Sequence, residues 1–422
     1  MSYFTEAAWR SLINMSNAMV IGIGGVGSVI GQKLHEFDCF DKIVLADMDP
    51  VFAQQLQARK SRSRYVVVQA NAMNTEALAK LMMEHNVTVT CNACTCQTNH
   101  SVLEACLRAG SHYLDMAADI YSPPGVKRPG KNSFEAEIEK YHDAYLERGL
   151  AAVLCMGMDP GAVNVFARWA MDRLDTASSI RVLDADNAEV RGYRFAALFS
   201  PETLFEELNA IPYYVKEGKI TAGKPLETEV DWTRFPDPIG LVKTYAVAHE
   251  EGVSLGTYPP FVSKGVKYSV FKYALNEKIV NLARSIDLLQ LDTWKKIKVD
   301  GVEVSPIRVA TAHLPKPAQL GPTVDGYSCV GTEVRGTKDR RRVEYFIYTM
   351  DSHRDTYEKY GYSLTVVQTG IPPALTAKLL ATGKIPERGV LMPEALDPEE
   401  LMSNFTREGL PIFVEKREVE RL

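Results

Sequence analysis

A glycine-rich turn near the start of the chain is the feature that most constrains this sequence. The apolar run at residues 19–23 opens into the pattern Gly22-x-Gly24-x-x-Gly27. In dinucleotide-binding folds, the first glycine allows a sharp turn, the second lets the backbone approach a pyrophosphate, and the third lets a helix pack close to the sheet. The pyrophosphate then lies at the positive end of the helix dipole. The pattern therefore predicts a dinucleotide site.

The residues around the turn supply the context that a lone glycine pattern lacks. Residues 26–37 carry apolar side chains close to helical spacing, and a second apolar run at 43–46 ends in Asp47. Asp47 comes 20 residues after Gly27, which is the interval expected for the acidic residue that binds the adenosine ribose. Its carboxylate would accept hydrogen bonds from free ribose hydroxyls and would repel a phosphate. The sequence therefore favours NAD(H) over NADP(H).

A basic cluster after Asp49 argues in the other direction. It consists of Arg59, Lys60, Arg62 and Arg64, one of which could reach a 2′-phosphate if the intervening helix is short. The alternative is a solvated helix end and loop, and we expect this alternative because most runs of charge are surface features.

The composition is that of an ordinary globular protein. The 422 residues are 46% hydrophobic and 24% charged, which is enough for two or three domains. A formal net charge of −5 provides no basic face for nucleic acid, so we expect a small-molecule ligand. We see no secretion signal and no apolar stretch of roughly 18 residues that could span a bilayer. With seven cysteines, an odd number, the chain is expected to be cytoplasmic, with reduced thiols and no membrane contact.

Three closely spaced cysteines, Cys91, Cys94 and Cys96, admit two interpretations. One Cys-x-x-Cys pair supplies half of a zinc shell, but a second pair with matching spacing is absent from the sequence. The cluster also follows the apolar run at 87–90, where a strand would turn into a helix beside the cofactor. We therefore expect no metal site. The expected cofactor contacts lie in the glycine turn and at the ends of the neighbouring strands: Gly22, Gly24, Gly25, Val26, Gly27, Asp47, Ala70, Asn71, Asn92, Ala93, Cys94 and Ala117.

The hydrophobic pattern divides the chain into three segments. In residues 1–160, strand-like and helix-like runs alternate, which is typical of a doubly wound parallel sheet and marks the dinucleotide-binding domain. Residues 161–362 show polar and apolar alternation, which favours an antiparallel sheet in a substrate and dimerisation domain. Residues 363–422 return to helical character, and we expect them to pack back on the first domain.

Four motifs together resemble the saccharopine dehydrogenase superfamily. They are the glycine turn, residues 103–115, the Asp159-Pro-Gly161 turn with the following Asn164-Val-Phe166, and residues 389–394. The similarity covers nearly the whole chain. The middle of the chain is most similar to the carboxynorspermidine and carboxyspermidine dehydrogenase branch, and the residues that carry this likeness are Phe199-Ser-Pro-Glu202, Tyr245 and His249-Glu-Glu251.

The resemblance implies an α/β fold, in which a Rossmann doubly wound parallel sheet carries an inserted α+β domain that shapes the substrate pocket and forms a homodimer. It also implies an NAD(P)-dependent oxidoreductase acting on a C–N bond. In this branch, an imine of aspartate semialdehyde and a diamine becomes a carboxylated polyamine. Saccharopine dehydrogenase and lysine 6-dehydrogenase activities are the alternatives.

The sequence departs from the polyamine branch at two places. Ala46-Asp47-Met48 stands where that branch tends to have a small or hydroxyl residue followed by Arg, which suits a 2′-phosphate. Residues 116–121 also differ from the polar residues of relatives. The first departure favours NAD, and the second leaves the substrate open.

Hydride transfer to an iminium carbon depends more on positioning than on acid–base chemistry, because the cation is already electrophilic. A carboxylate would stabilise the positive nitrogen, and Asp119 and Asp159 are the candidates. Asp159 precedes Pro-Gly, and we consider a structural role as cap of the following helix as well supported as a catalytic role. His249 with Glu250 is a candidate acid–base pair, although a His-Glu pair is more often a solvated helix face.

Four further residues are candidate substrate contacts: Asn164, Tyr193, Tyr245 and Tyr258. The tyrosines would supply pocket walls or hydroxyl donors, although most tyrosines are packing residues. A hypothesis of a different class is an NAD(H)-binding sensor without turnover, because a fold alone does not establish a function. Such a sensor would bind NADH and would not oxidise it with any amino-acid-derived imine.

Overall fold

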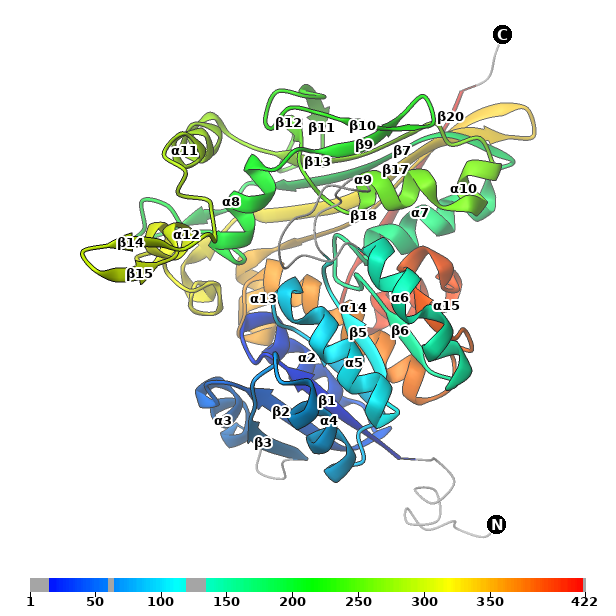
Figure 1. The fold of residues 1–422 in the computed structure, drawn as a ribbon. Coiled ribbons are helices and arrows are strands. Elements are labelled where there is room, and N and C mark those ends of the chain that lie inside the picture. The colour runs from blue at the N-terminus through cyan, green and yellow to red at the C-terminus, as the bar shows by residue number, and fades with distance from the viewer. Residues whose placement is uncertain (1–14, 60–63, 119–133, 420–422) are drawn as a thin grey trace, which may run out of the picture. The chain divides into compact units, whose positions relative to one another are not determined.

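A computed structural model describes residues 15–59, 64–118 and 134–419 of the chain, and its ribbon is drawn in Figure 1. The chain forms two compact units. The first contains the described residues up to 162 together with residues 368–409, and the second contains residues 163–367 and the described residues from 410 onward. The second unit is thus an insertion into the first. After residue 409 the chain returns to the second unit and forms its last strand there.

A seven-stranded parallel sheet forms the centre of the first unit. Its strands are β1 (Ser16–Ile21), β2 (Phe40–Asp47), β3 (Tyr65–Gln69), β4 (Val89–Asn92), β5 (His112–Asp115), β6 (Ala151–Val153) and β19 (Gly389–Leu391). They are arranged in the order β19-β6-β5-β4-β1-β2-β3, and all neighbours are parallel. The order reverses between β1 and β4, where doubly wound sheets bind ligands at the carboxyl ends of their strands. The predicted Rossmann sheet is confirmed.

Helices connect and flank these strands (Figure 1). They are α2 (Gly25–Glu36), α3 (Val51–Ala58), α4 (Thr75–Glu84), α5 (Asn99–Ala109), α6 (Phe134–Glu147), most of α14 (Leu364–Ala381) and α15 (Pro398–Glu408). The central strands contain successive buried apolar residues, as for Met19, Val20 and Ile21 of β1 at 0–1% exposure. Burial on both faces is what a parallel sheet covered by helices requires. This is why β1 continues from Ala18 to Ile21 as an uninterrupted apolar run.

A nine-stranded mixed sheet forms the centre of the second unit. Its strands are β7 (Thr176–Asp186), β9 (Tyr213–Lys216), β10 (Lys219–Ala222), β11 (Asp231–Arg234), β12 (Leu241–Ala246), β13 (Tyr268–Ala274), β17 (Tyr327–Lys338), β18 (Arg341–Ser352) and β20 (Ile412–Val419). The main order is β10-β9-β13-β7-β17-β18-β20, with β12 paired to β13 and β11 paired to β12. Every pair is antiparallel except β7 with β13. The antiparallel character expected for this segment is therefore present, with one parallel pair that alternation did not predict.

The second unit also contains shorter elements around this sheet. Its helices are α7 (Ala162–Arg173), α8 (Pro201–Asn209), α9 (Glu251–Thr257), α10 (Pro259–Ser263), α11 (Glu277–Leu288), α12 (Pro306–Thr311) and α13 (His353–Tyr360). Two small antiparallel pairs are β14 (Ile297–Val299) with β15 (Val302–Val304), and β8 (Glu189–Val190) with β16 (Val324–Asp325). Helix α9 packs against β9 and β13.

The end of the chain differs from the helical segment expected for residues 363–422. Helices α14 and α15 are present, but β20 then pairs with β18 in the second sheet, with Ile412 opposite Thr349. The pairing partner lies far back in the sequence, so local patterning did not reveal it. Among the described helices, none combines the length and the apolar character needed to cross a bilayer.

Candidate active site

The glycine turn lies between β1 and α2, at the switch point of the parallel sheet. Gly22 has a φ of +87°, and a side chain there would lie 2.7 Å from Cys94 Sγ and 2.9 Å from the carbonyl oxygen of Ala93. A side chain at Gly27 would overlap the carbonyl oxygen of Gly22. Among the described residues, none has an atom within 4 Å of a Cβ placed at Gly24. Gly22 and Gly27 are thus required by the fold, whereas Gly24 leaves open space in front of the backbone.

That open space lies at the N-terminus of α2. Helix α2 begins at Gly25, and its N-cap residue Gly24 supplies no side-chain hydrogen bond to the first turn. The backbone N–H groups of a first turn are orphan donors that an anion can accept from. Gly25 and Val26 are half-buried at this point. The arrangement fits the pyrophosphate of a dinucleotide.

Asp47 ends β2 directly beside the turn. The backbone N–H of Ile23 donates to Asp47 Oδ2 at 2.6 Å, and the N–H of Asp49 donates to Asp47 Oδ1 at 2.9 Å. Each carboxylate oxygen has a second lone pair available for a ribose hydroxyl. The sequence spacing predicted that Asp47 lies at this edge of the sheet. The structure shows in addition that its carboxylate accepts a hydrogen bond from the glycine turn.

The basic cluster divides between two places. The guanidinium of Arg64 donates to the carbonyl oxygens of Phe37 (3.0 Å), Phe40 and His35. Arg64 directly precedes β3, on the side of the sheet where β2 also begins. In a parallel pair this is the amino end, opposite the edge that carries Asp47. Arg59 is exposed after α3. Lys60 and Arg62 lie outside the described residues.

The side chain of Asn92, a predicted cofactor contact, forms hydrogen bonds within the fold. It is fully buried, and its Nδ2 donates to Thr98 Oγ1 (3.1 Å) and Asn99 Oδ1 (3.0 Å). Its Oδ1 accepts from the N–H of Cys94 at 3.3 Å. These bonds shape the turn after β4 and hold the Ala93 carbonyl next to Gly22.

Cys94 is a protonated thiol beside the glycine turn. Burial, together with the negative charge of Asp47, raises the pKa of Cys94 to about 12. Cys91 is fully buried inside β4, where burial also raises its pKa. Within the described part of the chain, the potential metal ligands that lie within 4.8 Å of one another belong to His249, Glu250 and Glu251. The cysteines do not form such a group there.

The remaining predicted cofactor contacts follow the ends of β3 and β5. The N–H of Ala70 donates to the carbonyl oxygen of Asp47 at 2.9 Å, and Asn71 is exposed directly after it. Ala117 is exposed two residues after β5, and its carbonyl oxygen accepts from Asn99 Nδ2 at 2.9 Å. All of these residues therefore lie at the carboxyl edge that carries the glycine turn.

The structure reveals a buried carboxylate that sequence reasoning missed, Asp115 at the end of β5. It accepts hydrogen bonds from the Tyr113 hydroxyl (2.8 Å) and from the backbone N–H of Cys155 (2.6 Å). Its backbone carbonyl accepts from the N–H of Met156 at 2.8 Å. Asp115 thus joins the end of β5 to the residues that follow β6.

The predicted catalytic carboxylates fall in different circumstances. Asp119 lies outside the described residues. Asp159 is half-buried in a tight turn in which the N–H of Gly157 donates to the Pro160 carbonyl at 2.8 Å. Asn164 is fully buried in the first turn of α7.

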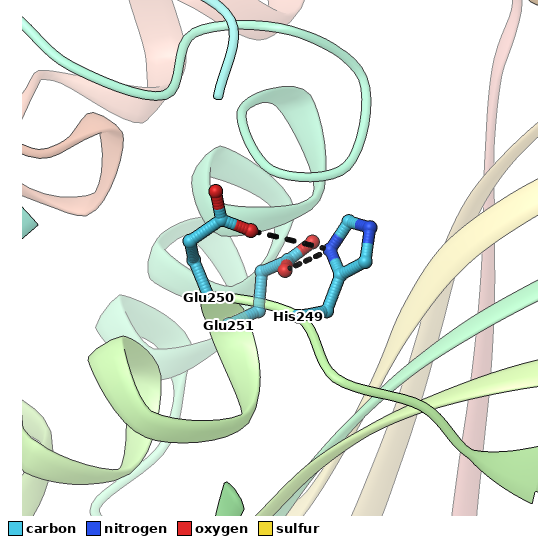
Figure 2. A group of neighbouring side chains, drawn as sticks. All are labelled: His249, Glu250 and Glu251. Carbon is cyan, nitrogen blue, oxygen red and sulfur yellow. Dashed lines mark hydrogen bonds and ion pairs between the residues drawn. The ribbon is translucent and has the colours of Figure 1, made fainter. Parts of the chain in front are cut away.

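His249 lies in the second unit, between β12 and α9, in a cluster of carboxylates. Figure 2 shows its ring facing the side chains of Glu250 and Glu251. Nδ1 of His249 is 2.6 Å from Glu251 Oε2 and 3.7 Å from Glu250 Oε2, and Nε2 is 3.8 Å from Glu207 Oε1. The ring also stacks on Phe271 at a centroid distance of 3.9 Å. The alternative of a solvated His-Glu face is wrong, because the His249 side chain is only 9% exposed and Glu251 is fully buried.

The carboxylates determine the charge of His249. Burial alone lowers the pKa of an imidazole, but the neighbouring Glu251, Glu207 and Glu250 outweigh it and raise the pKa of His249 well above 6.5. The imidazole is therefore protonated at neutral pH and donates to Glu251. The other oxygen of that carboxylate, Glu251 Oε1, is buried and has no hydrogen-bond partner among the residues that the structure describes. Glu207 and Glu251 were not among the predicted site residues, and only the quoted His-Glu-Glu motif hinted at the second.

The predicted tyrosines differ in exposure. Tyr193 is 48% exposed, whereas Tyr245 is 4% exposed and has the Lys243 ammonium 5.4 Å from its ring centroid. Tyr258 is half-buried between α9 and α10, with its ring edge-on to Phe261.

Comparison with known proteins places both units in one family. Residues 18–153 match the saccharopine dehydrogenase NADP binding domain, and residues 157–410 match the saccharopine dehydrogenase C-terminal domain. The chain is 28% identical to carboxyaminopropylagmatine dehydrogenase of Synechocystis sp., over 94% of this chain and 97% of that protein. It is 30% identical to carboxynorspermidine synthase of Vibrio alginolyticus, over 94% of this chain and 96% of that protein. It is also 30% identical to carboxynorspermidine synthase of Vibrio cholerae, over 92% of this chain and 94% of that protein.

Proposed function

The chain belongs to the saccharopine dehydrogenase family of NAD(P)-dependent dehydrogenases, and from this premise we propose that it reduces the imine formed between an amino-acid semialdehyde and an amine. The product would be a carboxylated polyamine, as the names of the relatives indicate for those proteins. The observation that carries the proposal is the group of three carboxylates, Glu207, Glu250 and Glu251, around the single charge of His249, because an amine substrate is a cation and needs a negative partner. The N-terminal unit supplies the cofactor site.

The residues of the first unit fit a nicotinamide dinucleotide. Gly24 leaves room for the pyrophosphate against bare backbone, and the first turn of α2 provides the N–H donors. Asp47 would bind the adenosine ribose. A bound NAD(P)H supplies the hydride for reduction of the C=N bond.

We propose that NAD(H) is preferred over NADP(H). The carboxylate of Asp47 stands beside the turn and would repel a 2′-phosphate. Arg64, one of the basic residues that could offset this repulsion, is engaged by main-chain carbonyls at the other edge of the sheet.

In the second unit, Glu251 would hold the amine nitrogen of the substrate. Its Oε2 accepts from His249, and its buried Oε1 has no hydrogen-bond partner among the described residues, so we propose Oε1 as the acceptor for the substrate N–H. A positive nitrogen developed in the imine would be stabilised by this carboxylate, whereas His249 would keep a proton close to the nitrogen. Asp159 and Asn164 remain proposed site residues on the strength of the family motif.

The test follows loss of NADH and NADPH absorbance with aspartate semialdehyde and a panel of diamines, including agmatine. Turnover with semialdehyde and an amine supports the proposal. Turnover only with lysine or saccharopine in the oxidative direction assigns the alternative dehydrogenase activity. NADH binding without turnover of any of these substrates would favour the sensor hypothesis.

A further inference from the structure

A pocket of about 620 Å³ lies within the second unit. It opens at the carboxyl ends of β7 and β13, the parallel pair of the sheet, and residues of β11, β12, α8, α11 and the segment 195–199 complete its walls. This volume is typical of small-molecule sites. The lining includes no residue of the nucleotide-binding unit and none of the His249 cluster, so the proposed function leaves this pocket unexplained.

Large apolar side chains dominate the lining. Phe195, Phe199 and Tyr273 supply aromatic surface, and Trp232 and Leu241 face solvent there at 66% and 53% exposure. Leaving an indole and a leucine this exposed is costly, since each forgoes most of the free energy that burial would provide. A ligand with a flat apolar body would recover it.

Most of the polar side chains in the lining are already used by the fold. Asp186 accepts from His353 Nε2 (2.8 Å) and from the N–H of Ala188 (2.5 Å). Asn187 accepts from the N–H of Tyr327 at 2.7 Å, and Asn276 caps α11. These hydrogen bonds shape the walls of the pocket.

Lys243 is the polar side chain that remains for recognition. It stands directly opposite Trp232 in the β11–β12 register, so both side chains lie on the same face of the sheet. No ion pair of Lys243 is found among the described residues, and its ammonium lies over the Tyr245 ring, 5.4 Å from the ring centroid. Glu277 also lines the pocket, but it is exposed at the start of α11.

We propose that this pocket binds an aromatic or similarly flat apolar small molecule that carries one negative group. The apolar body lies against Trp232 and the neighbouring aromatic side chains, and the anion pairs with the Lys243 ammonium. We place the anion at Lys243 because this residue is the cation among the described lining residues and stands opposite Trp232. Of the two lining carboxylates, Asp186 is hydrogen-bonded within the fold and Glu277 is exposed.

Two fluorescent probes with related ring systems test this proposal on the full chain. 8-Anilinonaphthalene-1-sulfonate carries the anion, and N-phenyl-1-naphthylamine lacks it. Titration of each probe, followed by energy transfer from tryptophan, is expected to show one saturable site per chain. Lys243→Met should weaken the sulfonate probe about five- to tenfold and leave the uncharged probe unchanged. Trp232→Ala should weaken both probes.

Matched variants separate the site from general surface binding. Lys219→Met removes an exposed lysine of the same unit outside the pocket and should change neither affinity. Glu277→Gln should strengthen the sulfonate probe slightly, because it removes a nearby negative charge. Equal sulfonate affinity in Lys243→Met and in the unmodified protein would overturn the proposal, and so would the absence of saturable binding. Sedimentation of the unmodified chain and of Trp232→Ala tests a contact with a second copy. The proposal would be overturned in favour of that contact if the chain self-associates, the probe weakens this self-association, and Trp232→Ala abolishes it.

Discussion

The carboxylate of Asp47 and the backbone N–H of Ile23 are joined by a hydrogen bond of 2.6 Å, so the residue proposed to read the ribose also holds the glycine turn in place. The two functions are coupled because β2 and the β1–α2 turn end at the same edge of the sheet. A substitution at Asp47 therefore changes both nucleotide selectivity and turn geometry. Comparison of the two nicotinamide cofactors separates these effects.

Asp47→Ala is expected to weaken NADH binding about ten- to a hundredfold, because a charge-assisted hydrogen bond to the ribose is lost. NADPH binding should weaken less, since the substitution also removes a repulsive charge. The measurement is the dissociation constant of each cofactor by protein fluorescence. Equal losses for both cofactors would show that Asp47 acts only through the turn.

Gly24→Val is expected to abolish cofactor binding without unfolding the protein. No atom of the described residues lies within 4 Å of its Cβ, and the backbone of Gly24 is extended, with a negative φ of −81°. The midpoint of thermal unfolding should stay close to that of the unmodified chain. Gly27→Ala is the contrasting variant, because its Cβ would overlap the Gly22 carbonyl and should lower the unfolding midpoint itself. A folded Gly24→Val protein that still binds NADH would remove the turn from the cofactor site.

Glu251→Gln is expected to lower kcat/KM for the amine substrate at least tenfold, since a neutral amide replaces the buried carboxylate proposed to hold the cation. The dissociation constant of NADH should not change. Glu227→Gln, at an exposed glutamate of the same unit, is the matched control and should behave as the unmodified enzyme. Unchanged amine kinetics in a folded Glu251→Gln protein would exclude Glu251 from amine recognition.

The raised pKa of His249 predicts a stability term at neutral and acidic pH. Because the folded-state pKa lies above the ordinary 6.5, the stabilising contribution is fully present below pH 6.5 and is lost as pH rises through the folded-state pKa. Urea unfolding across this range should show the stability advantage of the unmodified chain over His249→Gln shrinking as pH rises. An advantage that grows with pH would contradict a protonated His249.

His112 predicts the opposite pH dependence in the first unit. Burial, together with the nearby charge of Arg388, lowers the pKa of His112 to about 4, and its Nδ1 accepts from the N–H of Ala151 at 2.9 Å. Between pH 6.5 and pH 4, His112 is therefore protonated in the unfolded chain and neutral in the folded chain. The free energy of unfolding should decrease as pH falls through this range. The stability gap between the unmodified chain and His112→Asn should be narrower at pH 5 than at pH 7. A pH-independent gap would show that His112 titrates normally in the folded state.

Sequence patterning predicted the first unit well because its signals are local. A buried strand, three glycines and an acidic residue at the end of the next strand lie within residues 19–47, and the parallel sheet brings their ends to one edge. The same patterning missed the destination of β20, because its pairing with β18 joins residues more than sixty positions apart. It also gave no sign that the Asn92 side chain donates hydrogen bonds to Thr98 and Asn99 within the fold.

The sequence by itself determined the Rossmann unit, the glycine turn and the position of Asp47, because backbone conformation and short strand-to-helix turns depend on neighbouring residues. Only the tertiary structure decided that His249 is buried and charged. Its state depends on Glu207 from α8, on Glu251 from α9 and on the Phe271 ring from β13. Burial and the pKa of a side chain are set by the groups that folding brings around it, and in this second unit those groups come from separate elements of the chain.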